Sequence, residues 1–230
     1  MISILVPTLN EEKNIPLLIK QLKKIKFKYE LIIIDDNSND NTDKIIKKFI
    51  NNKISYIKRR SKDRDLSKSV FLGVKKSKFN YIMVIDCDLQ HNIISSNLMY
   101  KKIKKNKIDV LIGSRFYKKK YSGNLGVLRS IFSLFFIILI NLFLKKLSSD
   151  PLSGYFMCKK KLVLDYHKTF YLKGYKILFD IIYNGKKNIT VEDIQIIFKK
   201  RLFGKSKLNL KIVIIFLKQF FYTFYLKLSR

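Results

Sequence analysis

The chain has 230 residues, of which 47% are hydrophobic, so it can bury the core of one domain but is too short for two full domains. Its 48 Lys and Arg residues against 17 Asp and Glu residues give a formal net charge of +31, which favours an anionic partner such as nucleic acid, phospholipid or a phosphorylated substrate, although many lysines could simply be solvated. The 2 cysteines lack a metal-ligand spacing and are too few for a disulfide framework, which excludes a disulfide-stapled scaffold.

The first hundred residues alternate short apolar runs with helical patterns, beginning directly after Met1 without a secretion signal. We therefore expect the catalytic part to lie in the cytoplasm. The alternation predicts βαβ units, and so an α/β fold built on a mostly parallel sheet. The expected strands span residues 2–6, 31–34, 55–57, 81–85 and 110–112, and the expected helices span residues 14–25, 43–49 and 67–76.

Two apolar segments follow in the second half of the chain, at residues 131–144 and 208–228. The first is bracketed by Arg129 and by a lysine pair, and at about 1.5 Å per residue it would reach roughly 21 Å, short of the roughly 30 Å hydrocarbon core of a bilayer. The second carries basic residues and tyrosines at helical spacing: Lys207, Lys211, Lys218, Tyr222 and Tyr225. We expect both segments to be helices at a membrane surface, with core helices as the alternative.

Four of the expected strands end in polar clusters, at residues 7–12, 35–42, 86–91 and 113–115. Ligands bind at the carboxyl ends of strands in open parallel sheets, so these clusters should converge on one crevice. Asp86 and Asp88 are separated by one residue after a strand, which should turn both carboxylates to the same side. Such a pair suits Mg²⁺ or Mn²⁺, although an Asp-x-Asp sequence by itself is more often a structural turn.

Several ordered motifs together resemble one protein family. They are Val-Pro-Thr-Leu-Asn-Glu-Glu at 6–12, Ile-Asp-Asp-Asn-Ser-Asn-Asp-Asn-Thr at 34–42, Asp-Cys-Asp-Leu-Gln-His at 86–91 and Gly-Ser-Arg-Phe at 113–116, followed by Asp150, residues 153–156, 174–180 and 191–208. In this order and spacing they resemble the family 2 glycosyltransferases, in particular the dolichol-phosphate mannose synthase branch. The resemblance covers nearly the whole chain and implies a GT-A-like fold that uses a nucleotide diphosphate sugar.

The resemblance also implies roles for residues in the strand-end clusters. It suggests that the nucleotide base and ribose are held by Pro7, Leu9, Glu11 and Asp36, and that the diphosphate is served through a metal by Asp88. The implied ligands of the Mg²⁺ or Mn²⁺ ion are Asp86, Asp88 and Gln90. A carboxylate at a strand end can accept hydrogen bonds from ribose hydroxyls or base N–H groups, which agrees with this interpretation. For Asp36 the alternative is a turn or a helix cap.

Cationic residues are implied to act on the phosphates. Arg201, Ser206 and Lys207 lie on a loop after the strand-like segment 194–198, and in the family the matching loop closes over the donor diphosphate and the acceptor phosphate. Gly204 within this loop suits a mobile lid. Arg115 and Arg129 stand where the resemblance implies contacts with the acceptor phosphate. The residues expected to act in catalysis are therefore Asp88, Arg115, Arg129, Arg201 and Lys207.

The chain departs from the family pattern in several places. Asn37 stands where the family usually has a glycine, which is tolerable because asparagine also enters the left-handed backbone region. Asp180 stands where a glutamate is frequent. His91 could be proposed as a general base, but its place directly after the metal-site segment favours a structural role. The paired transmembrane helices of many bacterial relatives are missing, which leaves room for a membrane-anchoring partner subunit.

We therefore expect a GT-A-like domain over residues 1–207, including the interfacial helix at 131–144, and an amphipathic helix over residues 208–230. The expected reaction is metal-dependent, inverting transfer of a mannose- or glucose-type sugar to a polyprenyl or dolichyl phosphate at the cytoplasmic face of a membrane. The alternative acceptor is a hydroxyl of an envelope polysaccharide or glycolipid. A basic nucleic-acid-binding protein is disfavoured, because clustered acids at the strand ends would repel phosphates unless a metal intervened.

Overall fold

A mixed sheet forms the centre of the protein, in the strand order β3-β2-β1-β4-β6-β5-β7. The computed structural model describes residues 1–105, 107–117, 127–204 and 209–229, with the backbone alone for residues 127–129. The strand pairs are parallel except for those of β6, which runs antiparallel to β4 and β5. The strands are β1 (Ile2–Thr8), β2 (Tyr29–Asp35), β3 (Ile54–Lys58), β4 (Tyr81–Val84), β5 (Val110–Ser114), β6 (Phe156–Lys159) and β7 (Val191–Gln195). The predicted α/β class is confirmed.

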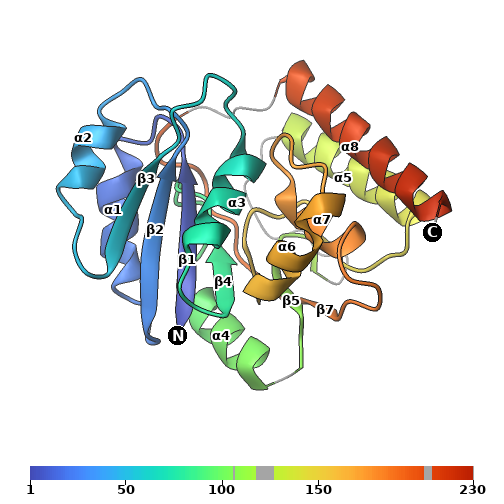
Figure 1. Cartoon of the computed structure of the whole chain (residues 1–230), viewed down its shortest axis with the longest axis horizontal. Helices are drawn as coiled ribbons and strands as arrows, with labels where there is room; N and C mark the ends of the chain where they lie inside the picture. Colours follow the sequence, from blue (N-terminus) through green and yellow to red (C-terminus); the bar gives the residue numbers. More distant parts are fainter. Residues whose placement is uncertain (106, 118–126, 205–208, 230) are drawn as a thin grey trace.

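Helices cover both faces of the sheet (Figure 1). Side chains alternate between the two faces along each strand, so each strand packs against helices on both sides. Ile4 and Val6 of β1 pack in one buried cluster with α1, α2 and α4. Leu5, between them, belongs to the cluster that includes α3, α5, α6, α7 and α8. The helices are α1 (Asn14–Leu22), α2 (Thr42–Lys47), α3 (Leu66–Lys76), α4 (Ser95–Lys105), α5 (Val127–Phe143), α6 (Lys160–Tyr166), α7 (Ile177–Tyr183) and α8 (Leu210–Leu228), with a 3₁₀ turn at His167–Thr169.

The elements predicted for the first half of the chain are confirmed, with ends that move by a few residues. The largest correction in the second half concerns the segment 194–198, because β7 begins at Val191 and ends at Gln195. Its partner β5 ends at Ser114, which pairs with Gln195. Residues after Gln195 therefore have no residue of β5 to pair with. Phe198 instead forms an isolated bridge with His91, which brings the following loop to the strand-end edge of the sheet.

Helices α5 and α8 lie side by side at one edge of the molecule (Figure 1). Phe136 and Phe216 pack edge to face with ring centroids 4.8 Å apart, and Phe143 makes similar contacts with Phe220 and Phe224. Both predicted apolar helices are therefore present, and α5 begins before the predicted segment. Within the described parts of the chain, neither these helices nor any other combines the length and hydrophobicity needed to cross a bilayer.

Candidate functional site

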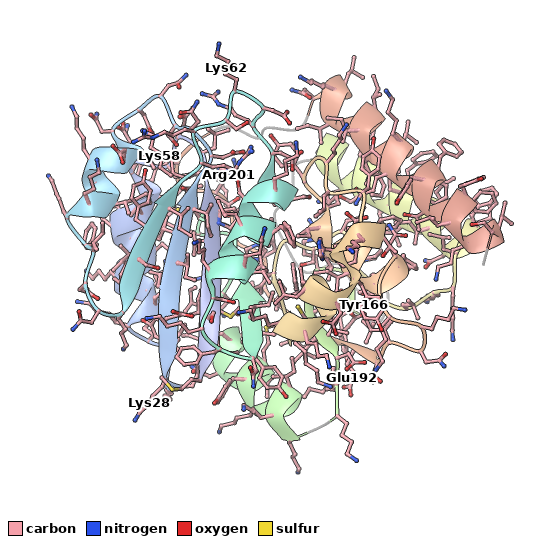
Figure 2. All side chains as sticks on the ribbon, viewed as in Figure 1. Lys28, Lys58, Lys62, Tyr166, Glu192 and Arg201 are labelled. Atoms are coloured by element: carbon pink, nitrogen blue, oxygen red, sulfur yellow. The ribbon has the colours of Figure 1, made fainter. Side chains whose placement is uncertain are left out.

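One cavity opens at the carboxyl ends of the strands. It is lined by members of all four polar clusters that the sequence placed at strand ends, including Pro7, Asp36, Asp86 and Arg115. The predicted convergence on one crevice is therefore confirmed. Figure 2 shows Arg201 at this edge of the sheet, while Lys28 and Glu192 mark the opposite edge.

The loop after β1 is fastened to the loop after β2 by hydrogen bonds. The backbone N–H of Glu11 donates to Thr42 Oγ1 at 2.9 Å, and the backbone N–H of Asn10 donates to Ser38 Oγ at 2.8 Å. Asn10 and Asn37 both adopt left-handed backbone conformations, with φ of 56° and 62°, so asparagine does replace glycine at residue 37 as predicted. Pro7, Leu9 and Glu11 line the cavity from this pair of loops.

Asp36 lies on the cavity wall and is held by two donors. The Arg59 guanidinium lies 2.6 Å from Asp36 Oδ1, and the backbone N–H of Asp65 donates to the other carboxylate oxygen. Burial raises the pKa of Asp36 above that of an ordinary aspartate, although Arg59 acts in the opposite direction. The alternative role as a turn or helix cap is wrong for Asp36, because its neighbour Asp35 accepts the turn hydrogen bonds from Ser38.

Asp86 and Asp88 both line the cavity, as the predicted geometry of the strand end requires. Asp86 Oδ2 lies 3.3 Å from His91 Nε2, and a Cβ atom at Gly154 would lie only 2.5 Å from Asp86 Oδ2. Glycine at residue 154 therefore leaves the space that the Asp86 carboxylate occupies. Asp88 Oδ2 lies 2.7 Å from an Nη atom of Arg201.

Gln90 fastens the Asp88 segment to the loop that follows β7. Its side-chain amide donates to the carbonyl oxygen of Lys199 at 3.1 Å, and its backbone carbonyl accepts from the Lys199 N–H at 2.7 Å. Arg201 donates to Gln90 Oε1 at 3.4 Å. The Gln90 side chain thus holds the loop in place, and its role as a metal ligand stays a prediction.

The donor set suits a hard divalent cation that is only partly coordinated by protein. Mg²⁺ and Mn²⁺ accept carboxylate oxygens together with waters and substrate phosphates. Among the described residues no group of three or more His, Cys, Asp and Glu side chains could hold a metal ion. Asp86 and Asp88 could therefore contribute two ligands, and a bound diphosphate would have to help complete the coordination shell.

Arg115 belongs to a buried ion pair with Asp150. Its Nε and one Nη donate to the two carboxylate oxygens at 2.7 Å each, and its backbone N–H donates to Oδ2 at 3.0 Å. The guanidinium carbon also lies over the rings of Phe116 and Phe198, at 5.5 and 5.6 Å from their centroids. Arg115 still lines the cavity, so its predicted contact with an acceptor phosphate remains untested.

The wall opposite the strand ends is built from α5 and α8. Phe132, Phe136, Ile212 and Phe216 give this wall an apolar surface, and Lys176 lies beside them in the same lining. A cavity that is acidic and polar at one side and apolar at the other suits an amphiphilic ligand. Sequence patterns did not single out Lys176, which lies inside the matched segment 174–180 but carried no assigned role.

The faces of α5 and α8 that point away from the cavity are also apolar. Leu142 is 74% exposed and Tyr225 is 69% exposed. The other large apolar side chains exposed on these two helices, besides Phe132 in the cavity lining, are Ile131, Leu134, Phe135, Ile138, Phe143, Leu210, Ile214, Phe221 and Leu228. Exposed apolar side chains gathered on two neighbouring helices are typical of a binding surface.

The structure brings together most of the residues that the sequence named. Those that line the cavity are Pro7, Leu9, Glu11, Asp36, Asp86, Asp88, Arg115 and Arg201. Ser206, Lys207 and the side chain of Arg129 lie outside the described part of the chain. The roles assigned to them stay predictions.

Comparison with known proteins gives consistent matches. The family model described as Glycosyl transferase family 2 matches residues 3–166. A dolichol-phosphate mannosyltransferase of Pyrococcus furiosus is 30% identical over 224 residues, which cover 96% of this chain and 62% of that protein. A dolichyl-phosphate beta-glucosyltransferase of Dictyostelium discoideum is 24% identical, over 85% of this chain and 65% of that protein. These matches confirm the resemblance that the motifs indicate.

Solved structures share the fold. A glucosyl-3-phosphoglycerate synthase from Mycobacterium tuberculosis, in complex with Mn²⁺, uridine diphosphate and glucosyl-3-phosphoglycerate, matches with a TM-score of 0.69 and 14% identity, covering 95% of this chain and 79% of that chain. S. aureus TarS in complex with UDP-GlcNAc matches with a TM-score of 0.63 and 22% identity, covering 89% of this chain and 59% of that chain. The GT-A-like fold implied by the motifs is therefore confirmed.

Proposed function

The chain belongs to glycosyl transferase family 2, and from this premise we propose that it transfers a hexose from a nucleotide diphosphate sugar to a polyprenyl or dolichyl phosphate at a membrane surface. The chain spans 62% of the length of the Pyrococcus furiosus relative, so the activity in that protein's name is carried over as a proposal. The observation that carries it is the two-sided cavity, with aspartates on one side and the apolar faces of α5 and α8 on the other. A charged donor and a hydrocarbon-bearing acceptor would each meet a matching wall.

The donor would bind on the strand-end side of the cavity. Glu11 and Asp36 offer carboxylate oxygens to ribose hydroxyls or base N–H groups, and Arg201 offers a cation to the diphosphate. Asp86 and Asp88 would hold a divalent metal, which when bound offsets the charge on the departing diphosphate. A fold neighbour that holds Mn²⁺ with uridine diphosphate supports this assignment.

A phosphate acceptor suits the groups that line the cavity. A phosphate monoester is already anionic near neutral pH, so its oxygen can form the new bond to the anomeric carbon as the bond to the nucleoside diphosphate breaks. This single displacement would invert the anomeric configuration. A hydroxyl acceptor would need a general base to remove its proton. His91 is the histidine that could be proposed for this role, but its side chain is buried and its Nε2 faces Asp86. His91 would therefore position Asp86.

The exposed faces of α5 and α8 would lie against the membrane. Exposed Lys211, Lys218 and Lys227 on α8 would attract anionic headgroups, and the apolar side chains would enter the interface. This arrangement would bring the lipid acceptor to the cavity along the surface on which it resides. The proposed location is the cytoplasmic face, and the apolar surface would allow binding without a separate anchoring subunit.

The acceptor assay is the primary test. Purified protein would be incubated with labelled UDP-glucose or GDP-mannose and vesicles that carry either polyprenyl phosphate or the matching polyprenol. We expect glycolipid only from the phosphate. Transfer to a saccharide hydroxyl, with none to polyprenyl phosphate, would refute the proposal and favour the hydroxyl acceptor.

The metal assignment predicts a large effect of Asp88→Asn. Loss of one carboxylate should weaken Mn²⁺ binding and lower turnover by about 100-fold or more, while the fold stays intact. Mn²⁺ binding would be followed by electron paramagnetic resonance in the presence of the nucleoside diphosphate. Asp43→Asn, at a surface salt bridge with Lys47, is the matched control. Unchanged Mn²⁺ affinity in Asp88→Asn would contradict the assignment.

The membrane assignment predicts that the purified chain floats with anionic vesicles and that salt releases only part of it. Salt screens the lysines but does not remove apolar contact. Replacing Phe221 and Tyr225 together by Ser should lower recovery, whereas Ile50→Ser, an exposed apolar site after α2, should not. Complete release by moderate salt would point to electrostatic attraction alone. Failure of the purified wild-type chain to bind vesicles would restore the need for an anchoring partner.

A further inference from the structure

Lys176 lies where the polar and apolar sides of the cavity meet. It is the residue before α7, and it lines the cavity together with Leu152, Phe216 and Gln219. Its ammonium donates to the carbonyl oxygen of Leu152 at 2.8 Å. Leu152 is two residues before Gly154, whose Cα faces the Asp86 carboxylate. The ammonium therefore lies beside the segment that passes the Asp86 carboxylate, in a cavity whose lining also includes the apolar ring of Phe216.

The backbone around Lys176 is fixed from both sides of the cavity. The N–H of Gly174 donates to Asp65 Oδ2 at 2.7 Å, and the carbonyl of Gly174 accepts from the Ser67 N–H at 3.0 Å. From the other side, Gln219 of α8 donates to the Lys176 carbonyl oxygen at 3.2 Å. These bonds join the beginning of α3, the Lys176 segment and α8, so they fix the backbone from which the Lys176 side chain extends.

Gly174 is needed for this placement. Its φ is +87°, in the left-handed region that side chains disfavour, and a Cβ atom there would lie 2.7 Å from the side chain of Ile215. The segment can therefore pass close to α8 only with glycine at this position. Two residues later, Lys176 enters the cavity beside that same helix.

A lysine at such a boundary suits the charged head of an anionic amphiphile. Its methylene stem can pack along apolar side chains while the ammonium stays at the polar side. A ligand with a phosphate at one end of a hydrocarbon chain would place its charge at the ammonium and its chain between α5 and α8. We infer that Lys176 is a further acceptor-binding residue, which holds the phosphate of the polyprenyl phosphate at the entrance to this apolar wall.

This inference rests on the proposed function and adds a specific residue to it. An ammonium acts as a point charge with several donors, so it can hold a phosphate oxygen while another oxygen of the same group reacts. Its contribution would appear in the affinity for the acceptor. The affinity for the nucleotide sugar should change little, because the proposed donor contacts come from Glu11, Asp36 and Arg201.

The test compares Lys176→Met and Lys176→Arg with Lys173→Met, an exposed lysine in the same segment. For Lys176→Met we expect the KM for polyprenyl phosphate to rise by about tenfold or more, with the KM for the nucleotide sugar within about twofold of wild type. Lys176→Arg should recover most of the acceptor affinity, and Lys173→Met should behave like wild type. An acceptor KM that does not change in a folded Lys176→Met protein would overturn the inference.

Direct binding separates this inference from the reaction. Calorimetric titration with a short isoprenyl phosphate and with the matching alcohol would be performed on the wild type and on each variant, and melting temperatures would verify folding. We expect Lys176→Met to lose affinity for the phosphate only, and Lys176→Gln serves if Lys176→Met does not fold. If the wild type binds the phosphate but transfers no sugar to it, the proposed function fails while the role of Lys176 remains decided by this titration. Equal phosphate binding by the wild type and the folded neutral variant would refute that role.

Discussion

Two arginine–aspartate pairs border the same cavity at the same closest N–O distance, but they differ in burial and in geometry. Arg115 with Asp150 and Arg201 with Asp88 each include an N–O distance of 2.7 Å. The side chains of the first pair are 4% and 0% exposed, and those of the second are 19% and 7% exposed. Arg115 follows strand β5 and makes a two-pronged contact, whereas Arg201 lies on the loop after β7.

Similar ion pairs in one cavity can therefore serve different purposes. A bidentate, fully buried pair is costly to break, so Arg115 and Asp150 form a fixed part of the wall. The Arg201 pair is partly exposed, and a metal or a diphosphate could compete for either partner. Gly204 of the same loop has a φ of +82°, in the left-handed region that favours glycine. We expect substrate binding to exchange the second pair and to leave the first intact.

Breaking the buried pair should lower the stability of the fold strongly. Arg115→Met or Asp150→Asn leaves one partner uncompensated in the core and should lower the free energy of unfolding by about 3–5 kcal/mol. Arg201→Met should lower it by less than about 1 kcal/mol. Urea unfolding of the three variants measures both values. Equal losses of unfolding free energy in Arg115→Met and Arg201→Met would show that the two pairs contribute equally to stability.

The exposed pair should affect donor use more than stability. Arg201→Met removes a charge-assisted contact to the diphosphate and should lower kcat/KM for the nucleotide sugar by about 10- to 100-fold. The same variant should bind Mn²⁺ more tightly than wild type in the absence of nucleotide, because the cation that competes for Asp88 is gone. Mn²⁺ titration followed by electron paramagnetic resonance measures this gain in metal affinity. A weaker Mn²⁺ affinity would show that Arg201 does not compete with the metal.

The smallest effect concerns a third pair, between Arg59 and Asp36. Burial already raises the pKa of Asp36, so its carboxylate takes up a proton at a higher pH than an ordinary aspartate as the solution is acidified. Arg59→Met should raise this pKa further and move the acid-side loss of nucleotide affinity to higher pH, with little change in alkaline solution. Binding of UDP and GDP across pH would be measured, with Lys58→Met as the surface control. A shift toward lower pH would contradict the assignment of Asp36 to the nucleotide.

Much of the fold could be predicted because its signals are local. Apolar runs such as residues 31–34 alternate with helical patterns, and this spacing is enough to indicate parallel strands joined by helices. The antiparallel strand β6 carried no such signal. The strand has only four residues. Its position in the sheet depends on pairing with β4 and β5, which are distant in the sequence. Chain topology of this kind is decided by packing between remote segments.

The candidate site also has features that could be predicted from local sequence and features that could not. Asp36, Asp86 and Asp88 stand at strand ends, so their convergence could be predicted from the sequence and the general rule for parallel sheets. The partner of each charge could not be predicted, because Asp150 is 35 residues from Arg115 and Arg201 is 113 residues from Asp88. Lys176 gave no signal for a related reason. Its place in the cavity depends on hydrogen bonds from Asp65 through Gly174 and from Gln219.

The way α8 packs has a practical consequence for producing this protein without detergent. Removing a carboxyl-terminal amphipathic helix is a common first step toward a water-soluble enzyme. Here Phe216 and Phe220 of that helix are buried against the core, and Gln219 supports the Lys176 backbone. Truncation before Leu210 would therefore uncover Phe136 and Phe179 and remove a cavity wall. Polar substitutions on the outward side of the helix are the better route to a soluble sample that retains its active site.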